Sequence, residues 1–336
     1  MKKLKVAVVI LNYKGWRDTV NCLKALRRST YKNYQIILID NGSHDESVEK
    51  LDKVVKSGDV WLKKTKNHGF AGGVNIGIRH AIKNGFDAVA LLNNDAQVEP
   101  DWLENLVTAM QKTKAAIVTG LLLSADGKTI DDAGDQYTTW GVPLLRAEHK
   151  PAAEAPESGY VFGSTGGATL YKTALFKDIG LFDEVFFAYN EDVDIDWRAQ
   201  LAGYKIWYEK SAVAYHKHSA TSQKMPGFTV YQIFKNLPLV LWKNLPRGMF
   251  LATAWRLFVA ELLLFGHKIL SGDGWPALKG IIKSWTLLPH ALRERRRIQA
   301  TKTVSNDYLK SLIYDGLPMK SVQRLRRFFG LKPKKW

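Results

Sequence analysis

Four acidic residues fall within six consecutive positions of a chain whose formal net charge is +17: Glu191, Asp192, Asp194 and Asp196. On a helix that begins near Glu191, Asp192 and Asp196 share one side, while Asp194 can pair with Arg198 four positions later. Acids in a first helical turn also complement the helix dipole, which is the alternative interpretation. A carboxylate that points into a cleft can instead act as a general base and take a proton from a hydroxyl. Asp192 is our candidate for that role.

A second acidic residue, Asp95, follows two amides in "LLNNDA" (91–96). A carboxylate in this setting could hold an oxygen-preferring cation such as Mg²⁺ against the phosphates of a ligand, although Asn and Asp also commonly end strands as plain turns. Two histidines, His216 and His218, are spaced so that they share one face of a strand. Metal ligands can have this spacing, but the spacing alone is not specific.

A glycine-rich stretch, "NHGFAGGVNIGI" (67–78), places three glycines before a predicted helix, so that backbone N–H groups could approach a diphosphate. It has neither the lysine of a P-loop nor a G-x-G-x-x-G pattern, which disfavours ATPase and dinucleotide chemistry. In "LIDNGSHDES" (38–47), Asp40 precedes a predicted helix cap at Ser43 or Asp45. Asp40 could accept a hydrogen bond from a base N–H.

Alternating elements must position these groups. Apolar runs that favour strands are "VAVVIL" (6–11), "QIILID" (35–40) and "AVALLN" (88–93). Helical patterns lie between them, at about 17–28, from about 45, and at 72–85. This alternation predicts βαβ units and a mainly parallel, Rossmann-like central sheet with helices on both faces. Ligands bind such sheets at the carboxyl ends of the strands, which are followed by Asn12-Tyr13, Asp40 and Asn93-Asn94-Asp95.

Composition divides the chain in two. Residues 1–225 are predicted to form an α/β domain. The segment 146–159, rich in Ala, Pro and Glu, is interpreted as an exposed, mobile loop within it. Residues 226–336 are rich in Trp, Leu, Phe and Lys and predict a helical extension. The single cysteine, Cys22, has the spacing of a packed core thiol, which fits a reducing cytoplasm.

The basic excess is concentrated near the end of the chain. Residues 285–336 contain thirteen Lys or Arg against three acids, which points to an anionic surface, either membrane or nucleic acid. The segment 319–336 alternates apolar and basic residues as an amphipathic helix on an anionic membrane does, and an ordinary solvated helix is the alternative. The Trp- and Leu-rich segment 240–270 could lie on the membrane too. Charged residues interrupt its apolar stretch 249–270, so we do not expect it to span a bilayer.

Taken together, these motifs resemble those of a known family. They follow one another in the order Asn12-Tyr13, "IDNGS", "NHGFAGGVNIG", "LLNND", "GSTGGATLYKTALFKDIGLFDEVFFAYNEDVDIDWRAQLAGYKIWY" and "AVAYHKHS". The order and the residues of these motifs resemble family 2 of the inverting glycosyltransferases, most closely its rhamnosyltransferase-like branch, over about residues 5–225. A weaker similarity continues at "FKNLPLVLWKNLP". The resemblance implies a GT-A fold, a nucleotide-diphosphate sugar donor and a divalent cation, Mg²⁺ or Mn²⁺. It also implies that residues 1–225 form the catalytic domain, with a nucleotide-sugar half over about 1–120 and an acceptor half over about 121–225.

The resemblance also implies roles for single residues on the donor side. Tyr13 would stack on the pyrimidine of the donor, and Asp40 would accept its N3–H. Asn67 and Gly69 would line the nucleotide site, and Asn94 would contact the ribose.

Further roles follow for the reacting end of the site. Asp95 matches the final metal-binding acid of the family, and His216 matches the histidine that can complete the metal or diphosphate site. Asp192 matches the catalytic base, with Glu191 beside it near the acceptor. The usual Asp-x-Asp is reduced here to Asn93-Asn94-Asp95, which implies weaker metal affinity.

The expected function is transfer of a sugar, with rhamnose favoured, from a dTDP or UDP donor to a glycan or polyprenyl-linked glycan. The reaction would serve cell-surface polysaccharide synthesis from the cytoplasmic face of the membrane. Alternatives are a UDP-hexose transferase of the same family and a non-catalytic protein of membrane surfaces or nucleic acid. No nucleic-acid-binding module is apparent, so we expect no nucleic-acid partner. A sugar-phosphate nucleotidyltransferase would need a glycine-rich basic loop after the first strand, which "LNYKGWRDT" lacks.

Overall fold

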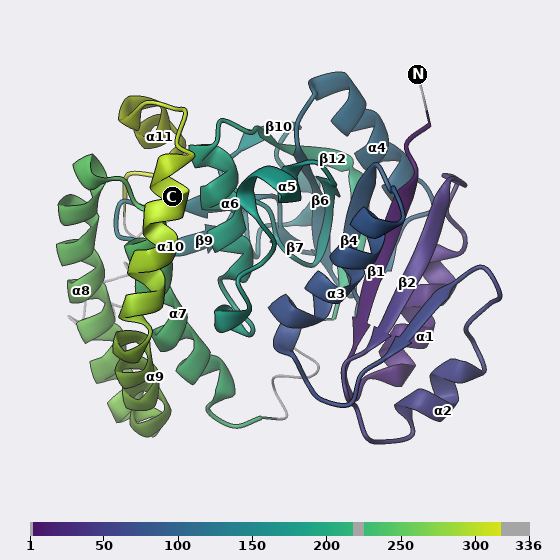
Figure 1. Cartoon of the computed structure of the whole chain (residues 1–336), viewed down its shortest axis with the longest axis horizontal. Coiled ribbons are helices and arrows are strands. Elements are labelled where there is room, and N and C mark those ends of the chain that lie inside the picture. The colour runs from purple at the N-terminus through teal and green to yellow at the C-terminus, as the bar shows by residue number, and fades with distance from the viewer. Residues whose placement is uncertain (1–2, 218–224, 317–336) are drawn as a thin grey trace.

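The computed structural model describes residues 3–217 and 225–316 (Figure 1). The strands are β1 (Val6–Asn12), β2 (Tyr34–Asp40), β3 (Val60–Lys63), β4 (Ala88–Asn93), β5 (Ala96–Val98), β6 (Ile117–Ser124), β7 (Ile130–Asp132), β8 (Asp135–Tyr137), β9 (Pro143–Leu145), β10 (Gly159–Val161), β11 (Ala168–Lys172) and β12 (Ile206–His216). The helices are α1 (Trp16–Leu26), α2 (Ser47–Asp52), α3 (Gly69–Lys83), α4 (Trp102–Thr113), α5 (Leu175–Ile179), α6 (Glu191–Leu201), α7 (Phe228–Asn244), α8 (Arg247–Leu270), α9 (Gly274–Thr286), α10 (Leu288–Ala300) and α11 (Asn306–Leu312), with short 3₁₀ turns at η1 (Ala152–Glu154) and η2 (Glu184–Phe186).

The central sheet is parallel in its first half, as predicted, but mixed as a whole. Its strand order is β3-β2-β1-β4-β11-β6-β12-β10, and β3, β2, β1 and β4 run parallel. β11 lies antiparallel to both of its neighbours, β4 and β6. The chain leaves β6 at the carboxyl end of the parallel strands and enters β11 at the same edge, where Ala168 pairs with Leu92. Because the chain enters β11 at this edge, β11 runs antiparallel to β4 and β6.

The register of the sheet brings the polar strand ends together. Asn12, the last residue of β1, pairs with Asp40, the last residue of β2, and Leu11 pairs with Asn93 of β4. The segment 163–167, which precedes β11, lies at this edge as well. The expectation that these groups share one edge of the sheet is confirmed.

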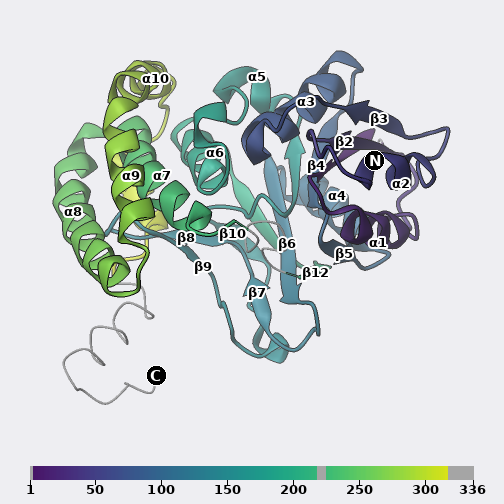
Figure 2. The ribbon, with the colours of Figure 1, turned by 90° about the horizontal axis from the view of Figure 1, so that it is seen from below.

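Helices cover both faces of the sheet, as predicted (Figure 2). One apolar core lies between the sheet and α1 and α4, and includes Leu23 and Trp102. A second core lies on the other face under α3, α5 and α6, and includes Ile78 and Ile195. Cys22 is fully buried in the first core, where burial raises the pKa of its thiol. The interpretation of Cys22 as a packed core residue is confirmed.

A third core joins α6 to the helices that follow the sheet. Trp197 of α6 packs in it with apolar residues of α7, α8, α10 and α11, and α7 to α11 form a layer beside the α/β unit (Figure 1). The helical character predicted beyond residue 226 is confirmed for the described part of that segment. The amphipathic pattern at 319–336 lies outside the described residues.

The segment 146–159 is exposed over much of its length, as predicted, but part of its backbone is paired with neighbouring residues. Backbone hydrogen bonds of 2.8 Å join Ile130 N–H to the Lys150 carbonyl and His149 N–H to the Ile130 carbonyl. Ala155 is buried in the second core. Because its backbone groups pair with the neighbouring β7 region, the segment is held against the sheet domain.

Candidate active site

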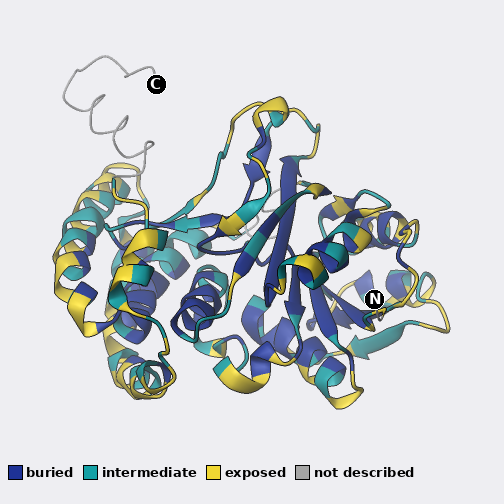
Figure 3. Cartoon of the chain, turned by 90° about the horizontal axis from the view of Figure 1, so that it is seen from above, coloured by how far each residue is buried: buried dark blue, intermediate teal, exposed yellow. Residues whose placement is uncertain are grey.

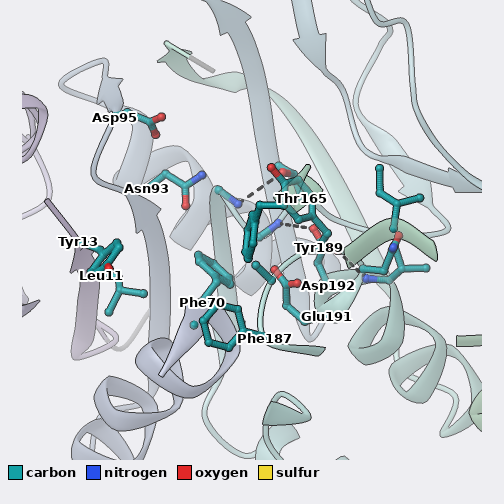
Figure 4. Close-up of a pocket in the computed structure, with 18 of the residues that line it drawn as sticks. Leu11, Tyr13, Phe70, Asn93, Asp95, Thr165, Phe187, Tyr189, Glu191 and Asp192 are labelled. Carbon is teal, nitrogen blue, oxygen red and sulfur yellow. Dashed lines mark hydrogen bonds between the residues drawn. The ribbon is translucent and has the colours of Figure 1, made fainter. Parts of the chain in front are cut away.

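A cavity of about 500 Å³ opens at the carboxyl edge of the sheet (Figure 4). Eight of the nine residues that the sequence predicts to carry function line it: Tyr13, Asn67, Gly69, Asn94, Asp95, Glu191, Asp192 and His216. They come from chain segments more than a hundred residues apart. The tertiary structure thus brings the candidate base, the candidate metal ligands and the candidate nucleotide-binding residues to one space.

Asp40 is the predicted residue that does not line the cavity. It is 1% exposed, and its Oδ1 accepts hydrogen bonds from the Asn12 amide (2.8 Å) and the Ser43 hydroxyl (2.5 Å). Its Oδ2 accepts one from the Ser43 N–H (3.1 Å). The neighbouring Asn41 faces the cavity instead. Contact between Asp40 and a base stays a prediction, and it would require these hydrogen bonds to rearrange.

The glycine-rich stretch does not precede its helix as predicted, while its contact with a diphosphate stays a prediction. Helix α3 already begins at Gly69, so Gly72 and Gly73 lie inside the helix and not in a loop before it. A Cβ on Gly73 would come within 2.6 Å of the Leu11 side chain on β1, so this glycine lets α3 pack closely on the sheet. Gly69 has φ +70°, and a Cβ there would collide with the carbonyl oxygen of Phe187.

Helix α6 begins at Glu191, as predicted, and its acids have separate partners. Asp192 Oδ2 accepts a hydrogen bond from Gly166 N–H at 3.2 Å, and Asp196 accepts two from Ser164 at 2.7 and 3.0 Å. Both carboxylates therefore contact the 163–167 loop, which confirms that they lie on one side of the helix. Burial raises the pKa of Asp192.

The other two acids of the helix differ from these. Asp194 pairs with Arg198 at 3.0 Å, as predicted from their spacing, and both side chains are buried. Burial, and then the charge of Asp192, raise the pKa of Glu191, whose Oε2 is buried without a hydrogen-bond partner. Asp194 thus has a structural role, while Glu191 lines the cavity.

The turn that precedes α6 is strained. Phe187, Tyr189 and Asn190 all have left-handed φ values, 63°, 68° and 64°, and all three line the cavity. Non-glycine residues adopt this conformation only where surrounding contacts enforce it, and such strain is common at functional sites. A specific set of contacts must therefore hold this turn.

Helix α7 supplies those contacts. The fully buried Asn236 amide donates hydrogen bonds to three carbonyl oxygens of the turn, those of Phe186 (3.0 Å), Ala188 (2.9 Å) and Tyr189 (2.6 Å). The Lys235 ammonium donates to the carbonyl oxygen of Phe186 at 3.0 Å. These two side chains fix the backbone that presents Glu191 and Asp192 to the cavity.

A sequence signal for this clamp is a repeated tetrapeptide. The tetrapeptide Lys-Asn-Leu-Pro occurs twice, at 235–238 and 243–246. The second copy binds α6 and the segment before it. Lys243 contacts Asp183 at 2.5 Å and Asp194 at 2.8 Å, and the Asn244 amide donates a hydrogen bond to Asp194 at 2.8 Å. A repeated Lys-Asn pair in an apolar helix indicates buried polar side chains that need partners.

Asp95 and His216 both line the cavity and contact each other. His216 Nε2 lies 3.2 Å from Asp95 Oδ1, and His216 Nδ1 lies 2.8 Å from Asp131 Oδ2. Burial alone would lower the pKa of His216, but the hydrogen bonds and charges of Asp131 and Asp95 raise it to about 9. His218 lies outside the described residues.

This pair fits a divalent cation. A carboxylate and an imidazole at this separation offer two adjacent ligands, and a second carboxylate on the far ring nitrogen is the usual way a metal-binding histidine is oriented. Within residues 3–217 and 225–316, no group of three or more His, Cys, Asp or Glu is arranged to hold a metal ion. Among these described residues, Asp95 and His216 offer the two ligands, and a bound molecule or water could supply others.

Three acids near the cavity were not among the predicted site residues: Asp131, Asp132 and Asp135. Asp131 orients His216, and Asp135 lines the cavity with its Oδ1 buried and without a hydrogen-bond partner. Burial is the main reason why the pKa of Asp132 rises to about 7 and the pKa of Asp135 rises well above its ordinary value. The cluster "DDAGD" (131–135), three acids in five positions, is the signal that could have revealed them.

Comparison with known proteins agrees with this geometry. A family model described as "Glycosyl transferase family 2" matches residues 7–180. The low-salt glycan biosynthesis hexosyltransferase Agl10 of Haloferax volcanii is 24% identical over 236 residues, which cover 69% of this chain and 73% of that protein. The poly-beta-1,6-N-acetyl-D-glucosamine synthase of Staphylococcus aureus is 28% identical over 203 residues, 59% of this chain. The match covers 45% of the synthase, so the chain spans less than half the length of that relative.

Two solved structures resemble the fold over most of its length. S. aureus TarS 1-349 in complex with UDP-GlcNAc has a TM-score of 0.56 at 14% identity, covering 89% of this chain and 91% of that one. The mannosyltransferase PcManGT from Pyrobaculum calidifontis, in complex with GDP-Man and Mn²⁺, has a TM-score of 0.53 at 14% identity, covering 89% and 88%. At such low identity the likeness concerns the fold.

Proposed function

Because the chain belongs to glycosyl transferase family 2 and has the GT-A fold, we propose that it transfers a sugar from a nucleotide diphosphate to a glycan hydroxyl with inversion of configuration. The observation that carries this proposal is the single cavity that Asp192, Asp95 and His216 all line. A candidate base and a candidate cation site are thereby available to one bound donor.

The donor site is proposed at the β1 end of the cavity. Tyr13 offers an aromatic ring for a base to stack on, and Asn41 and Asn67, whose side chains hydrogen-bond to each other, line the same cavity. The motif resemblance favours dTDP-rhamnose, and the relatives named as hexosyl and N-acetylglucosamine enzymes make a UDP-hexose the second candidate. Both donors carry a pyrimidine and a diphosphate, so this site suits either.

Asp95 and His216 would hold a divalent cation, Mg²⁺ or Mn²⁺, against the donor diphosphate. When bound, such a cation neutralises the charge that develops on a departing phosphate. Asp131 keeps the His216 ring in place through its hydrogen bond to Nδ1. Solved relatives of the same fold contain Mn²⁺, which supports this assignment. Because the usual Asp-x-Asp is reduced to Asn93-Asn94-Asp95, we expect weaker binding than in relatives with the full motif.

Asp192 is proposed as the general base. Its carboxylate lies in the cavity wall, where the Gly166 N–H and the Val193 N–H hold its two oxygens. From there it can take the proton of an acceptor hydroxyl as that oxygen attacks the anomeric carbon from the face opposite the diphosphate. Glu191, which lines the same cavity, is proposed to contact the acceptor.

The acceptor is proposed to be a glycan or a polyprenyl-linked glycan, reached from the cytoplasmic face of the membrane. The relatives named for glycan and polysaccharide synthesis support this class of acceptor. The thirteen basic residues in 285–336 support a location on an anionic membrane surface.

Donor binding can be tested by thermal unfolding with a panel of dTDP-rhamnose, UDP-glucose and UDP-N-acetylglucosamine, each with Mg²⁺ or Mn²⁺. A ligand that binds only the native state stabilises it and so raises the melting temperature. At a ligand concentration of a hundred times the dissociation constant, the gain in stability is about 2.7 kcal/mol. We expect a rise with one of these donors that needs the cation and is lost in Tyr13→Ala. Tyr160→Ala, an exposed tyrosine outside the cavity, is the control. If no sugar nucleotide shifts the transition, the proposed function is wrong.

The clamp on the turn before α6 gives a second test. Asn236→Ala removes three hydrogen bonds from a strained backbone, so the turn relaxes and Asp192 moves from its position. We expect kcat to fall roughly tenfold with little change in the KM for the donor. Asn105→Ala, which removes one surface hydrogen bond to Ser211, should leave both constants unchanged. Equal kinetics of the two variants would show that the clamp does not position the site.

A further inference from the structure

Helix α8 exposes a continuous apolar stripe. The residues of this α8 stripe recur at spacings of three, four and seven: Leu251, Trp255, Phe258, Leu262 and Ile269. Residues on the opposite side, such as Thr253 and Leu257, are buried against the rest of the molecule. On a helix this spacing puts the exposed residues on one face. The helix therefore has one face packed on the protein and one large apolar face in solvent.

The stripe belongs to a wider apolar surface. Of the fourteen large apolar side chains that are exposed among the described residues, eleven lie between 251 and 292. They include Trp275 and Ile282 of α9, which are 63% and 55% exposed. Figure 3 shows these helices at the outer end of the molecule, with much of their outer surface exposed. An apolar surface concentrated in this way marks an interaction site.

The charges around this surface are mostly positive. Residues 247–300 contain nine Lys or Arg against three Asp or Glu. One of the three acids, Glu261, has its Oε1 buried, and burial raises its pKa to about 7. Basic groups also lie over the exposed tryptophans, Lys279 over Trp275 at 5.0 Å and Arg256 over Trp255 at 5.7 Å. Tryptophan flanked by basic residues is typical of protein surfaces at a membrane interface.

We propose that α8 and α9 dock on an anionic phospholipid bilayer through this surface, with α8 lying in the plane of the interface. The apolar stripe would enter the boundary between headgroups and acyl chains, and the basic groups would contact lipid phosphates. This inference rests on the membrane location in the proposed function and assigns it to a surface. A second copy of the chain fits less well, because two surfaces with the same basic excess repel each other.

The packing of α8 argues for docking over spanning. By length and composition alone, the helix could cross a membrane, contrary to the expectation from its charges. Its inner face, however, packs on the loop that contains Gly141, where Thr253 and Leu257 lie closest, and Leu257 belongs to the third core. If α8 left this position to cross a bilayer, that core would be uncovered. A helix that keeps its inner face packed can offer the membrane only its outer stripe.

Vesicle flotation of the full chain tests this inference. We expect binding to phosphatidylcholine vesicles that contain phosphatidylglycerol and weak binding to phosphatidylcholine alone. The double variant Phe258→Glu, Leu262→Glu should bind anionic vesicles roughly tenfold less. Tyr160→Glu, which introduces the same charge at another exposed aromatic residue, should bind like the unmodified protein. Equal flotation of the double variant and the control would overturn the inference.

An environment-sensitive label gives a second readout that does not depend on that variant. Cys22 is fully buried, so a thiol-reactive dye will label an introduced Leu262→Cys selectively. Its emission should shift to the blue on anionic vesicles, and the same dye at Tyr160→Cys should not shift. Resistance to extraction by alkaline carbonate would indicate spanning, and concentration-dependent dimers without vesicle binding would indicate a second copy. Either result overturns the inference.

These outcomes are distinct from those that test sugar transfer. The melting shift with a donor is measured without vesicles, so it can fail while flotation succeeds. A donor shift retained in Phe258→Glu, Leu262→Glu would also show that the double variant is folded. If that folded double variant does not float with the vesicles, the loss is due to the docking surface alone.

Discussion

Replacing Asp192 by Asn is expected to lower the turnover of sugar transfer by about 10²-fold or more, with donor binding retained. The substitution keeps the shape and the hydrogen bond from Gly166, but an amide cannot take a proton from the acceptor. The melting shift with donor and cation should therefore survive, while single-turnover transfer slows. Because burial raises the pKa of Asp192, the rate of the unmodified enzyme should rise with pH as this carboxyl ionises.

The control for this prediction is Asp126→Asn, an exposed aspartate in the turn after β6. It should have normal turnover and the same pH dependence as the unmodified chain. Unchanged turnover in Asp192→Asn would exclude this carboxylate as the base. Loss of the donor shift in that variant would instead assign Asp192 to donor binding.

Replacing Lys243 by Met is expected to lower the free energy of unfolding by about 3–5 kcal/mol. The Lys243 side chain is 2% exposed and lies between Asp194, which is fully buried, and Asp183, whose side chain is 12% exposed. Without the ammonium, these two carboxylates lose their shared cation in a region of low dielectric constant. Urea unfolding followed by circular dichroism measures the change.

An exposed ion pair provides the comparison. Lys53→Met breaks the pair with Glu49 on the surface of α2, and such pairs contribute at most about 1 kcal/mol. If Lys243→Met is no more destabilising than Lys53→Met, the buried ion pairs of Lys243 do not hold α7 to α6.

The same network predicts how stability depends on pH. Burial alone would raise the pKa of Asp183, but the charge of Lys243 and the hydrogen bond with His290 hold it well below its ordinary value. A carboxyl whose pKa is depressed by folding contributes stability above its unfolded pKa of about 3.9. This contribution is present at neutral pH and is lost as the pH falls below about 4.

Local patterns in the sequence were sufficient for several features. The alternating runs predicted β1, β2, β4 and the helices between them, because strand and helix periodicity depend on residues a few positions apart. The start of α6 at Glu191 and the pair between Asp194 and Arg198 follow from spacing along one helix. The order of the motifs was sufficient to recognise the family, and eight of nine predicted site residues line the cavity.

Other features depended on contacts between distant segments. The direction of β11, the burial of Asp40 and the packing of Gly73 on Leu11 were not evident from neighbouring residues. The position of Asp131 beside His216 joins residues 85 positions apart.

The clamp on the turn before α6 is the clearest case. Asn236 lies about fifty positions from the carbonyl groups that it holds, and the Lys-Asn-Leu-Pro repeat around it does not identify those partners. Hydrogen bonds and charges act over a few ångströms in space, whatever the separation along the chain. The sequence by itself therefore determined which elements form and which motifs they carry. Only the packing of α6 against α7 and the 163–167 loop decided how Asp192 is held in the cavity.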